Sequence, residues 1–242
     1  MEKIQKNIIK YFQEKTGSNL ISIYAIGSYL TDDFIEGYSD IDLAVFVKNN
    51  VNLPHSETIQ TLSEKNGIKI GASYIAYDDF LNRIQDNAKA TRFFSNIFAL
   101  QMKNGKATLL YGKDLASMLP KNEVFLARNL QSELLNNYFH AKSPEKEKNV
   151  FVKEPMNFLG YILNMSNDLL VAKGVFSNKT NLVENIKKYY PSFGSIRAIE
   201  KALELRKKRR INFNQKEADD VKKMLSDFLD DYSLIVTQGN KN

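Results

Sequence analysis

The chain contains 242 residues, of which 43% are hydrophobic and 26% are charged. This is the composition of a globular protein long enough to bury a substantial core. It has no cysteine and only two histidines, which excludes a disulfide framework, cysteine-ligated zinc and a thiol nucleophile, and argues against a histidine-rich metal site. The formal net charge of +6 suits a nucleic acid or a single anionic nucleotide as partner and does not distinguish between them.

The first half of the chain mixes helical and strand patterns. Short apolar runs rich in β-branched residues indicate strands, and the clearest of them ends at Gly27. The predicted elements, in chain order, are an N-terminal helix, strand 20–26, strand 41–47, helix 56–65, strand 68–77, a helix capped by Asp78 or Asp79, helix 88–103 and a short strand 107–111.

Beyond Pro120 the pattern is helical throughout. Helices are predicted over 122–139, along the apolar face of Phe158, Ile162, Met165 and Leu169 up to Gly174, and over 194–209 and 215–236. Four or five amphipathic helices in succession are typical of an up-and-down bundle. The expected fold class is α+β: a small mixed sheet flanked by helices in residues 1–119, followed by an α-helical bundle domain in residues 120–242.

The N-terminal segment places Ile4, Ile8, Ile9 and Phe12 at helical spacing with charged residues between them. A signal peptide needs an uninterrupted apolar stretch, and this segment lacks one. Nowhere does an apolar stretch approach the length of a transmembrane helix. We therefore expect a cytoplasmic protein with no membrane partner.

Gly27 and Ser28 directly follow the first predicted strand. Glycine has no Cβ, so the backbone can approach a ligand closely at this point. If Ser28 begins a helix, the free N–H groups there and the serine hydroxyl form a phosphate site. Many strand-to-helix turns contain a Gly-Ser pair, so the pair alone does not identify such a site.

Asp40 and Asp42 lie two residues apart at the beginning of the second strand. Both side chains are expected on one face, while Ile41 and Leu43 point into the core. Two carboxylates this close repel each other unless a cation lies between them, and Mg²⁺ is commonly held by one or two carboxylates plus substrate phosphates. The alternative is a strand edge with solvated aspartates, but aspartate is a poor strand former, which favours the metal site.

The two motifs together, Gly27-Ser28 and then Ser39-Asp40-Ile41-Asp42, resemble the signature of the DNA polymerase β-like nucleotidyltransferase superfamily. The segment 110–114 and the helical second half, 181–206 in particular, are similar to bacterial aminoglycoside and spectinomycin adenylyltransferases. In those enzymes a small nucleotidyltransferase domain is followed by a helical bundle.

The resemblance implies a role for each residue of the motifs. Gly27 and Ser28 would hold the β- and γ-phosphates of ATP or another nucleoside triphosphate. Asp40 and Asp42 would be the catalytic residues that ligate Mg²⁺, and Ser39 would shape the turn before them. The implied reaction is transfer of a nucleoside monophosphate to a hydroxyl of a small-molecule acceptor. An aminoglycoside-like antibiotic is one implied acceptor, although a basic chain is an awkward host for a polycation.

The chain departs from the family at its usual third carboxylate. Aligning 68–75 with the third strand puts Gly71 at that position, where neither Lys69 nor Ser73 is a good replacement. By the family's logic this acid serves the metal that activates the attacking hydroxyl, so its loss should spare nucleotide binding and impair chemistry. A glutamate acting as general base could compensate; Glu133 and Glu154 are candidates, although both are expected on the solvated surface.

Three functions therefore remain open. The first is an active nucleotidyltransferase with a small hydroxylated acceptor. The second is a nucleotide-binding protein that has lost catalysis, which Gly71 favours. The third is a nucleotidyltransferase that modifies a protein or RNA, which the net charge favours. Nearby aromatic residues, Tyr24, Tyr29, Tyr38 and Tyr74, are expected to pack rather than to stack on a base, and His140 is expected to interact with a helix C-terminus.

Overall fold

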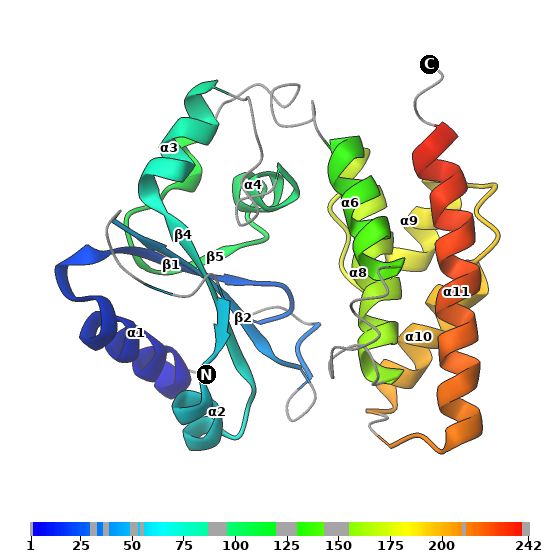
Figure 1. Cartoon of the computed structure of the whole chain (residues 1–242), viewed down its shortest axis with the longest axis horizontal. Coiled ribbons are helices and arrows are strands. Elements are labelled where there is room, and N and C mark those ends of the chain that lie inside the picture. Colours follow the sequence, from blue (N-terminus) through cyan, green and yellow to red (C-terminus); the bar gives the residue numbers. More distant parts are fainter. Residues whose placement is uncertain are drawn as a thin grey trace. The chain divides into compact units, whose positions relative to one another are not determined.

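The computed structural model describes residues 2–29, 33–35, 39–48, 53, 56–86, 96–119, 130–142, 155–209 and 212–238. The chain divides into two compact units, residues 1–127 and 128–242. The first unit contains a β-sheet with helices, and the described part of the second unit is helical (Figure 1). The α+β fold class is thereby confirmed. No helix in the described part of the chain combines the length and apolarity needed to cross a membrane.

The elements of the first unit alternate between helices and strands. In chain order they are α1 (Glu2–Thr16), the 3₁₀ helix η1 (Gly17–Asn19), β1 (Leu20–Ile26), β2 (Ile41–Val47), β3 (Ser56–Thr58), α2 (Gln60–Asn66), β4 (Ile70–Ala76), α3 (Tyr77–Asp86), α4 (Asn96–Lys103), β5 (Thr108–Gly112) and the 3₁₀ helix η2 (Ala116–Met118).

The five strands form one sheet in the order β3-β4-β2-β1-β5. β2 pairs parallel to β4, and the other neighbours pair antiparallel. The sheet is therefore mixed, as expected. β2 has a strand on each side, and from Leu43 to Val47 all its residues are buried, which explains its almost continuous apolar sequence.

Helices cover both faces of this sheet (Figure 1). On one face α1 and α2 pack through Ile8, Phe12 and Leu62 against a core of alternate strand residues. On the other face Phe46 of β2 contacts the ring of Phe80 from α3, with centroids 5.6 Å apart, and stacks on Phe98 of α4. Burying apolar residues on both faces fixes the strand register, because a slip by one residue would exchange the two faces.

The sequence prediction was wrong at the first residues of helix 56–65. Ser56–Thr58 form the short edge strand β3, which pairs with β4, and the helix begins only at Gln60. Ile59 N–H donates to the Ile70 carbonyl at 2.8 Å, so pairing with a distant strand satisfies backbone groups that a helix would otherwise use. Asp78 and Asp79 lie in the first turn of α3 rather than at its cap. The predicted helix 88–103 is described from Asn96 onward.

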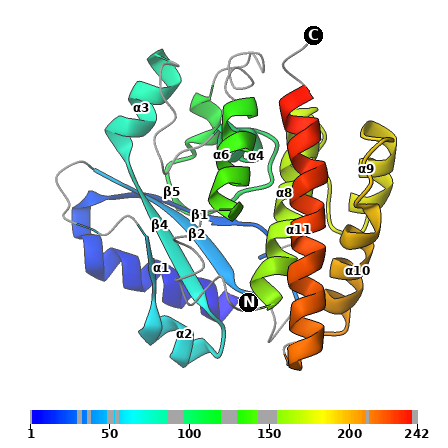
Figure 2. The ribbon, with the colours of Figure 1, turned by 45° about the vertical axis from the view of Figure 1, so that its right-hand side comes forward.

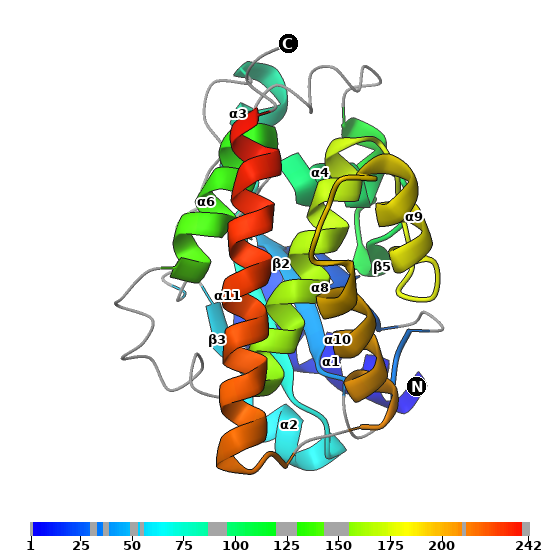
Figure 3. The same ribbon diagram turned by 90° about the vertical axis from the view of Figure 1, so that its right-hand side faces the viewer.

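The second unit is built around α8. Its described elements are α6 (Leu130–Lys142), α8 (Pro155–Ala172), α9 (Leu182–Tyr189), α10 (Ile196–Lys207) and α11 (Gln215–Gln238). α8 contacts each of the other four (Figures 2 and 3), and the face predicted from Phe158, Ile162, Met165 and Leu169 is buried. α9 was not predicted as a separate helix. His140 lies in the last turn of α6, but its side chain is outside the described residues.

Asp168 of α8 introduces a carboxyl group among these apolar residues. Part of the residue is exposed, but protein atoms surround its carboxyl group. Burial, followed by the nearby charge of Glu133, raises the pKa of Asp168 to about 7, and a hydrogen bond from Asn137 Nδ2 at 3.1 Å offsets only part of that rise. The pKa of an aspartate in an unfolded chain is about 3.9. Stability from this group is thus fully present below the unfolded pKa and is lost as the pH rises through about 7.

We expect Asp168→Asn to weaken the fall in stability between pH 5 and pH 8, because a carboxamide carries no charge and still accepts from Asn137. Thermal unfolding across this pH range measures the effect. The matched control is Asp220→Asn, an exposed aspartate of α11. If wild type and Asp168→Asn lose melting temperature in parallel over this range, the carboxyl group of Asp168 is not the titrating group.

Gly112 closes β5 against β1 with very little space. Its φ is +88°, and a Cβ at this position would lie 1.9 Å from the Ile21 carbonyl oxygen. Directly after it, Lys113 N–H donates to the same carbonyl at 3.2 Å, and Ser22 Oγ donates to the Lys113 carbonyl. A side chain would break this close approach, so the backbone requires glycine here.

Gly112→Ala is therefore expected to destabilise the protein much more than Gly105→Ala. Gly105 has a φ of +67° and no atom of the described residues within 4 Å of a built Cβ, so its substitution carries the left-handed strain of about 1–2 kcal/mol. Gly112→Ala adds a backbone clash and should cost at least twice as much. Urea unfolding monitored by circular dichroism measures both, and equal losses would contradict the proposed close approach.

Candidate active site

The two motifs found in the sequence lie at one end of the sheet, where β1 ends and β2 and β4 begin. Ile26, the last residue of β1, pairs with Asp42 of β2, and Asp42 pairs with Gly71 of β4. Gly27 and Ser28 follow Ile26 directly. The backbone of the Gly27-Ser28 turn and the carboxylate of Asp42 therefore lie at the same end of the sheet.

Gly27, Ser28 and Tyr29 form a turn, so the helix considered to begin at Ser28 is not seen in these described residues. Gly27 has a φ of +76°, no atom of the described residues lies within 4 Å of a Cβ built there, and the residue is exposed. Ser28 is half-buried beside it. A left-handed glycine with open space above it leaves the backbone accessible to a ligand.

Ser39 holds the turn that leads into β2. Its hydroxyl accepts a hydrogen bond from Ile35 N–H at 3.0 Å, and its own N–H donates to the Ile35 carbonyl at 2.8 Å. The side chain is buried, with 6% of its surface exposed. Ser39 thus sets the direction in which the chain reaches Asp40, and it acts on the turn rather than as a surface group.

Asp40 and Asp42 are exposed at the beginning of a strand that is otherwise buried. Ile41 between them and Leu43 after them lie in the core on the α1 side of the sheet. By the alternation of strand side chains, Asp42 faces the other side, the one that α3 and α4 cover. Two exposed carboxylates of this kind are a donor set that suits Mg²⁺ when phosphates supply further ligands.

Gly71 lies beside Asp42 on the neighbouring strand. A Cβ built at Gly71 would meet Asp42 Oδ1 at 3.5 Å and the Glu57 carbonyl oxygen at 3.9 Å, and these are its nearest neighbours among the described residues. A side chain on this residue would therefore share the face of Asp42. In the part of the chain that the structure describes, no group of three or more histidine, aspartate and glutamate side chains gathers where it could hold a metal.

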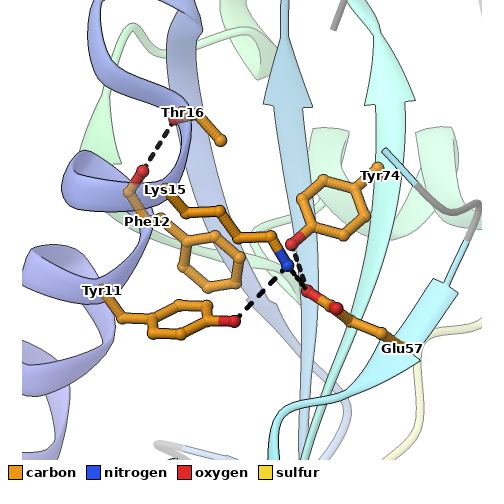
Figure 4. Close-up of polar contacts among 6 residues, drawn as sticks. All are labelled: Tyr11, Phe12, Lys15, Thr16, Glu57 and Tyr74. Carbon is orange, nitrogen blue, oxygen red and sulfur yellow. Dashed lines mark hydrogen bonds and ion pairs between the residues drawn. The ribbon is translucent and has the colours of Figure 1, made fainter. Parts of the chain in front are cut away.

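Glu57 is close to Gly71 through its backbone, but its side chain belongs to the opposite face. Lys15 Nζ and Tyr74 O–H both donate to Glu57 Oε1, and Lys15 also reaches Tyr11 O–H at 3.4 Å (Figure 4). Burial alone would raise the pKa of Glu57, but the hydrogen bonds from Lys15 and Tyr74 lower it below its usual value. This cluster joins edge strand β3 to α1 and does not supply the missing acid.

The segment after β5 is fixed to the sheet through Tyr24. The Tyr24 hydroxyl accepts from Leu115 N–H at 2.7 Å and donates to Asp114 Oδ1 at 3.0 Å. Burial, with the Asp114 contact, raises the pKa of Tyr24 to about 12 despite the backbone donors. Asp114, the last residue of the 110–114 motif, thus helps to attach the segment after β5 to the sheet.

The other tyrosines and glutamates considered for the site either pack in the interior or lie outside the residues that the structure describes. Tyr29 is buried against Phe34, with ring centroids 5.7 Å apart, and Tyr74 is buried in the core. Tyr38 and Glu154 fall outside the described residues. The expectation for Glu133 was wrong, since it lies in α6 with only 8% of its surface exposed.

Comparisons with known proteins give a domain match and likenesses to solved structures. A family model described as a nucleotidyltransferase domain matches residues 5–94. The crystal structure of spectinomycin adenyltransferase AAD(9) from Enterococcus faecialis, with ATP and spectinomycin, is similar to 95% of this chain and 98% of that one, at 15% identity and a TM-score of 0.58. A nucleotidyltransferase-like protein from Exiguobacterium sibiricum 255-15 aligns with 97% of this chain and 75% of its own, at 12% identity and a TM-score of 0.33. No protein with a curated description matches the sequence.

The family match runs from within α1 through α3, and this segment contains the Gly27-Ser28 turn, both aspartates and Gly71. The likeness to spectinomycin adenyltransferase extends over the helical unit and concerns the fold. Residues 5–94 therefore match a nucleotidyltransferase domain, a helical region follows in the chain, and the fold is similar to that of spectinomycin adenyltransferase.

Proposed function

We propose that this protein transfers a nucleoside monophosphate from ATP, or another nucleoside triphosphate, to a hydroxyl of a small-molecule acceptor in the cytoplasm. The observation that carries the proposal is the pair of exposed aspartates, Asp40 and Asp42, beside the open Gly27-Ser28 turn. A related fold that has been crystallised with ATP and spectinomycin supports both the nucleotide and the class of acceptor. An aminoglycoside-like antibiotic is one acceptor of this class. The proposal assigns the nucleotide to a domain of residues 1–119, with residues 120–242 as a separate helical domain.

The chain's own groups would act by binding and orienting the nucleotide. The Gly27 and Ser28 backbone, with the Ser28 hydroxyl, would hold the β- and γ-phosphates, and Asp40 and Asp42 would hold Mg²⁺. Mg²⁺ supplies neutralisation of phosphate charge and stabilises the charge that develops in the transition state. The acceptor oxygen forms a bond to the α-phosphorus, the bond from that phosphorus to the bridging oxygen breaks, pyrophosphate leaves with the bonding electrons, and the hydroxyl proton passes to solvent.

A second candidate function, nucleotide binding without efficient transfer, is favoured by Gly71. The position beside Asp42 carries no carboxylate, and the side chain of Glu57 on the adjacent strand is held on the other face by Lys15 and Tyr74. Fewer carboxylates at the site leave less negative charge to offset a second divalent cation. A missing carboxylate at position 71 would leave nucleotide binding through Asp40 and Asp42 intact. It would weaken activation of the acceptor hydroxyl. A protein or RNA acceptor has only the net charge of +6 in its favour.

Calorimetric titration of ATP tests the nucleotide site directly. We expect wild type to bind ATP in the presence of Mg²⁺, and Asp42→Asn to weaken that binding at least about tenfold, or 1.4 kcal/mol, because a carboxamide is a poor Mg²⁺ ligand. The matched control is Asp79→Asn, an exposed aspartate in the first turn of α3, which should bind like wild type. Absence of binding to any of the four common nucleoside triphosphates would refute the proposed function.

Gly71→Asp tests whether the missing carboxylate limits the chemistry. With water as the only acceptor, we expect pyrophosphate release from ATP to be at least tenfold faster in Gly71→Asp than in wild type, since the new carboxylate would lie beside Asp42. Gly71→Asn has nearly the same size without the charge and should remain at the wild-type rate. Equal rates in the Asp and Asn variants would show that the carboxylate at this position does not control turnover.

A further inference from the structure

Lys69 directly precedes β4 at the end of the sheet where the two aspartates lie. The pairing of β2 with β4 puts Ile41 opposite Ile70, and Ile41 N–H donates to the Lys69 carbonyl at 2.9 Å. Continued by one residue, this parallel register places Lys69 next to Asp40, on strands about 4.8 Å apart. The fold thus brings a lysine beside the first aspartate of the pair, although the two residues are far apart in the sequence.

The side chain of Lys69 shares the face of the aspartates. Ile70, the next residue, is fully buried in the core on the α1 side, so strand alternation directs Lys69 and Gly71 to the opposite side. The position of Gly71 agrees, because a Cβ built there would lie 3.5 Å from Asp42 Oδ1. Lys69 is exposed. A cationic side chain therefore lies on the same face as both carboxylates and can be reached from solvent.

The charge of the site explains why a cation is needed there. The two carboxylates of Asp40 and Asp42 cancel the two positive charges of a single Mg²⁺, so together they leave no net charge to attract phosphate. A triphosphate carries several negative charges, which require charged donors when they leave bulk water. A lysine ammonium is a point charge with three N–H donors and is well suited to phosphate oxygens. Lys69 supplies the positive charge that the aspartates and one metal ion lack.

The order of the strands determines which phosphate lies nearest to Lys69. β2 lies between β1 and β4, so β4 is two strand spacings, or about 10 Å, from the strand that ends at the Gly27-Ser28 turn. With its β- and γ-phosphates on that turn, a triphosphate that extends toward Asp42 brings its α-phosphate closest to β4. The α-phosphate is the group attacked in the proposed reaction, and preorganised donors are most effective where charge develops in the transition state.

We propose that Lys69 binds the α-phosphate of the nucleotide and neutralises the negative charge on its oxygens. The inference rests on the proposed function and adds a residue to its site. Lys69 donates hydrogen bonds to an oxygen that stays on the phosphorus, so no bond to the lysine forms and it keeps its proton. It requires no second divalent cation. It acts on the nucleotide and does not replace the carboxylate missing at position 71, which concerns the acceptor hydroxyl.

Protection of lysines from acetylation tests this contact directly. The protein is treated with a limiting amount of an amine-reactive acetylating reagent, with and without ATP and Mg²⁺, and each lysine is quantified by mass spectrometry. We expect ATP to slow acetylation of Lys69 at least about fivefold, because an ammonium bound to phosphate is covered and stays protonated. Lys65 is the control within the same molecule, since it is exposed in the last turn of α2, on the α1 side of the sheet. AMP, which has only the α-phosphate, should also protect Lys69, whereas pyrophosphate should not.

Calorimetric titration of ATP with Mg²⁺ measures what the lysine contributes to binding. Lys69→Gln is expected to weaken binding at least about tenfold, because it removes one charge next to the phosphates. Lys69→Arg keeps that charge and should bind within about threefold of wild type. Lys65→Gln is the matched control and should bind like wild type. Both lysines are exposed, so these variants are expected to fold, and their melting temperatures check this.

The two possible failures are distinguishable. If wild type binds ATP but Lys69 is acetylated equally with and without it, the inference is overturned and the proposed function stands. The same holds if Lys69→Gln binds ATP like wild type, or if pyrophosphate protects Lys69 and AMP does not. If wild type binds none of the four common nucleoside triphosphates, the proposed function and the inference are overturned together.

Discussion

The parallel pairing of β2 with β4 is the contact on which the site depends. It places Asp42 beside Gly71 and leaves the first residues of β2 at the edge where β1 ends. Asp40 directly precedes β2 and Asp42 is its second residue, and aspartate opposes strand formation by its low propensity and by the repulsion between two nearby carboxylates. The strand forms nevertheless, since residues 43–47 are buried between neighbouring strands and between helical layers. The free energy of burying residues 43–47 offsets the cost of placing Asp40 and Asp42 side by side at the start of the strand. The hydrogen bonds between Ser39 and Ile35 fix the backbone just before Asp40.

The sequence alone predicted the strands that are long, continuous apolar runs, and it missed the short edge strand. β1 and β2 have the predicted bounds, because both are apolar runs rich in β-branched residues that end at polar residues or glycine. β3 was missed since three residues carry no usable periodicity; pairing with β4 and the ion pair of Glu57 with Lys15 create that strand. These contacts join residues far apart in the sequence, so no window around residue 57 contains them.

The same limit explains what could be said of the site. The Gly27-Ser28 turn and the Asp40–Asp42 pair were found because their spacing is visible along the chain, and Gly71 was found by placing a third strand beside the second. Glu133 was misplaced on the surface, because charge alone does not tell which side of α6 its neighbours cover. In the structure Glu133 is buried and raises the pKa of Asp168 on α8. The helical unit thus buries two acidic groups, and their desolvation must be offset by packing of α6, α8 and α11.

Two glycines of the sheet illustrate how function can be separated from structure in a single chain. Gly112 has a left-handed φ and lies against the Ile21 carbonyl, so the fold alone accounts for it. Gly71 has ordinary backbone geometry and room for a side chain, so the fold does not account for it. A Cβ at Gly71 would lie in ordinary contact with the Asp42 carboxylate and the Glu57 carbonyl oxygen. The backbone of β1 therefore excludes a side chain at Gly112, whereas at Gly71 a side chain is sterically allowed and would lie beside the carboxylate on which the proposed site depends.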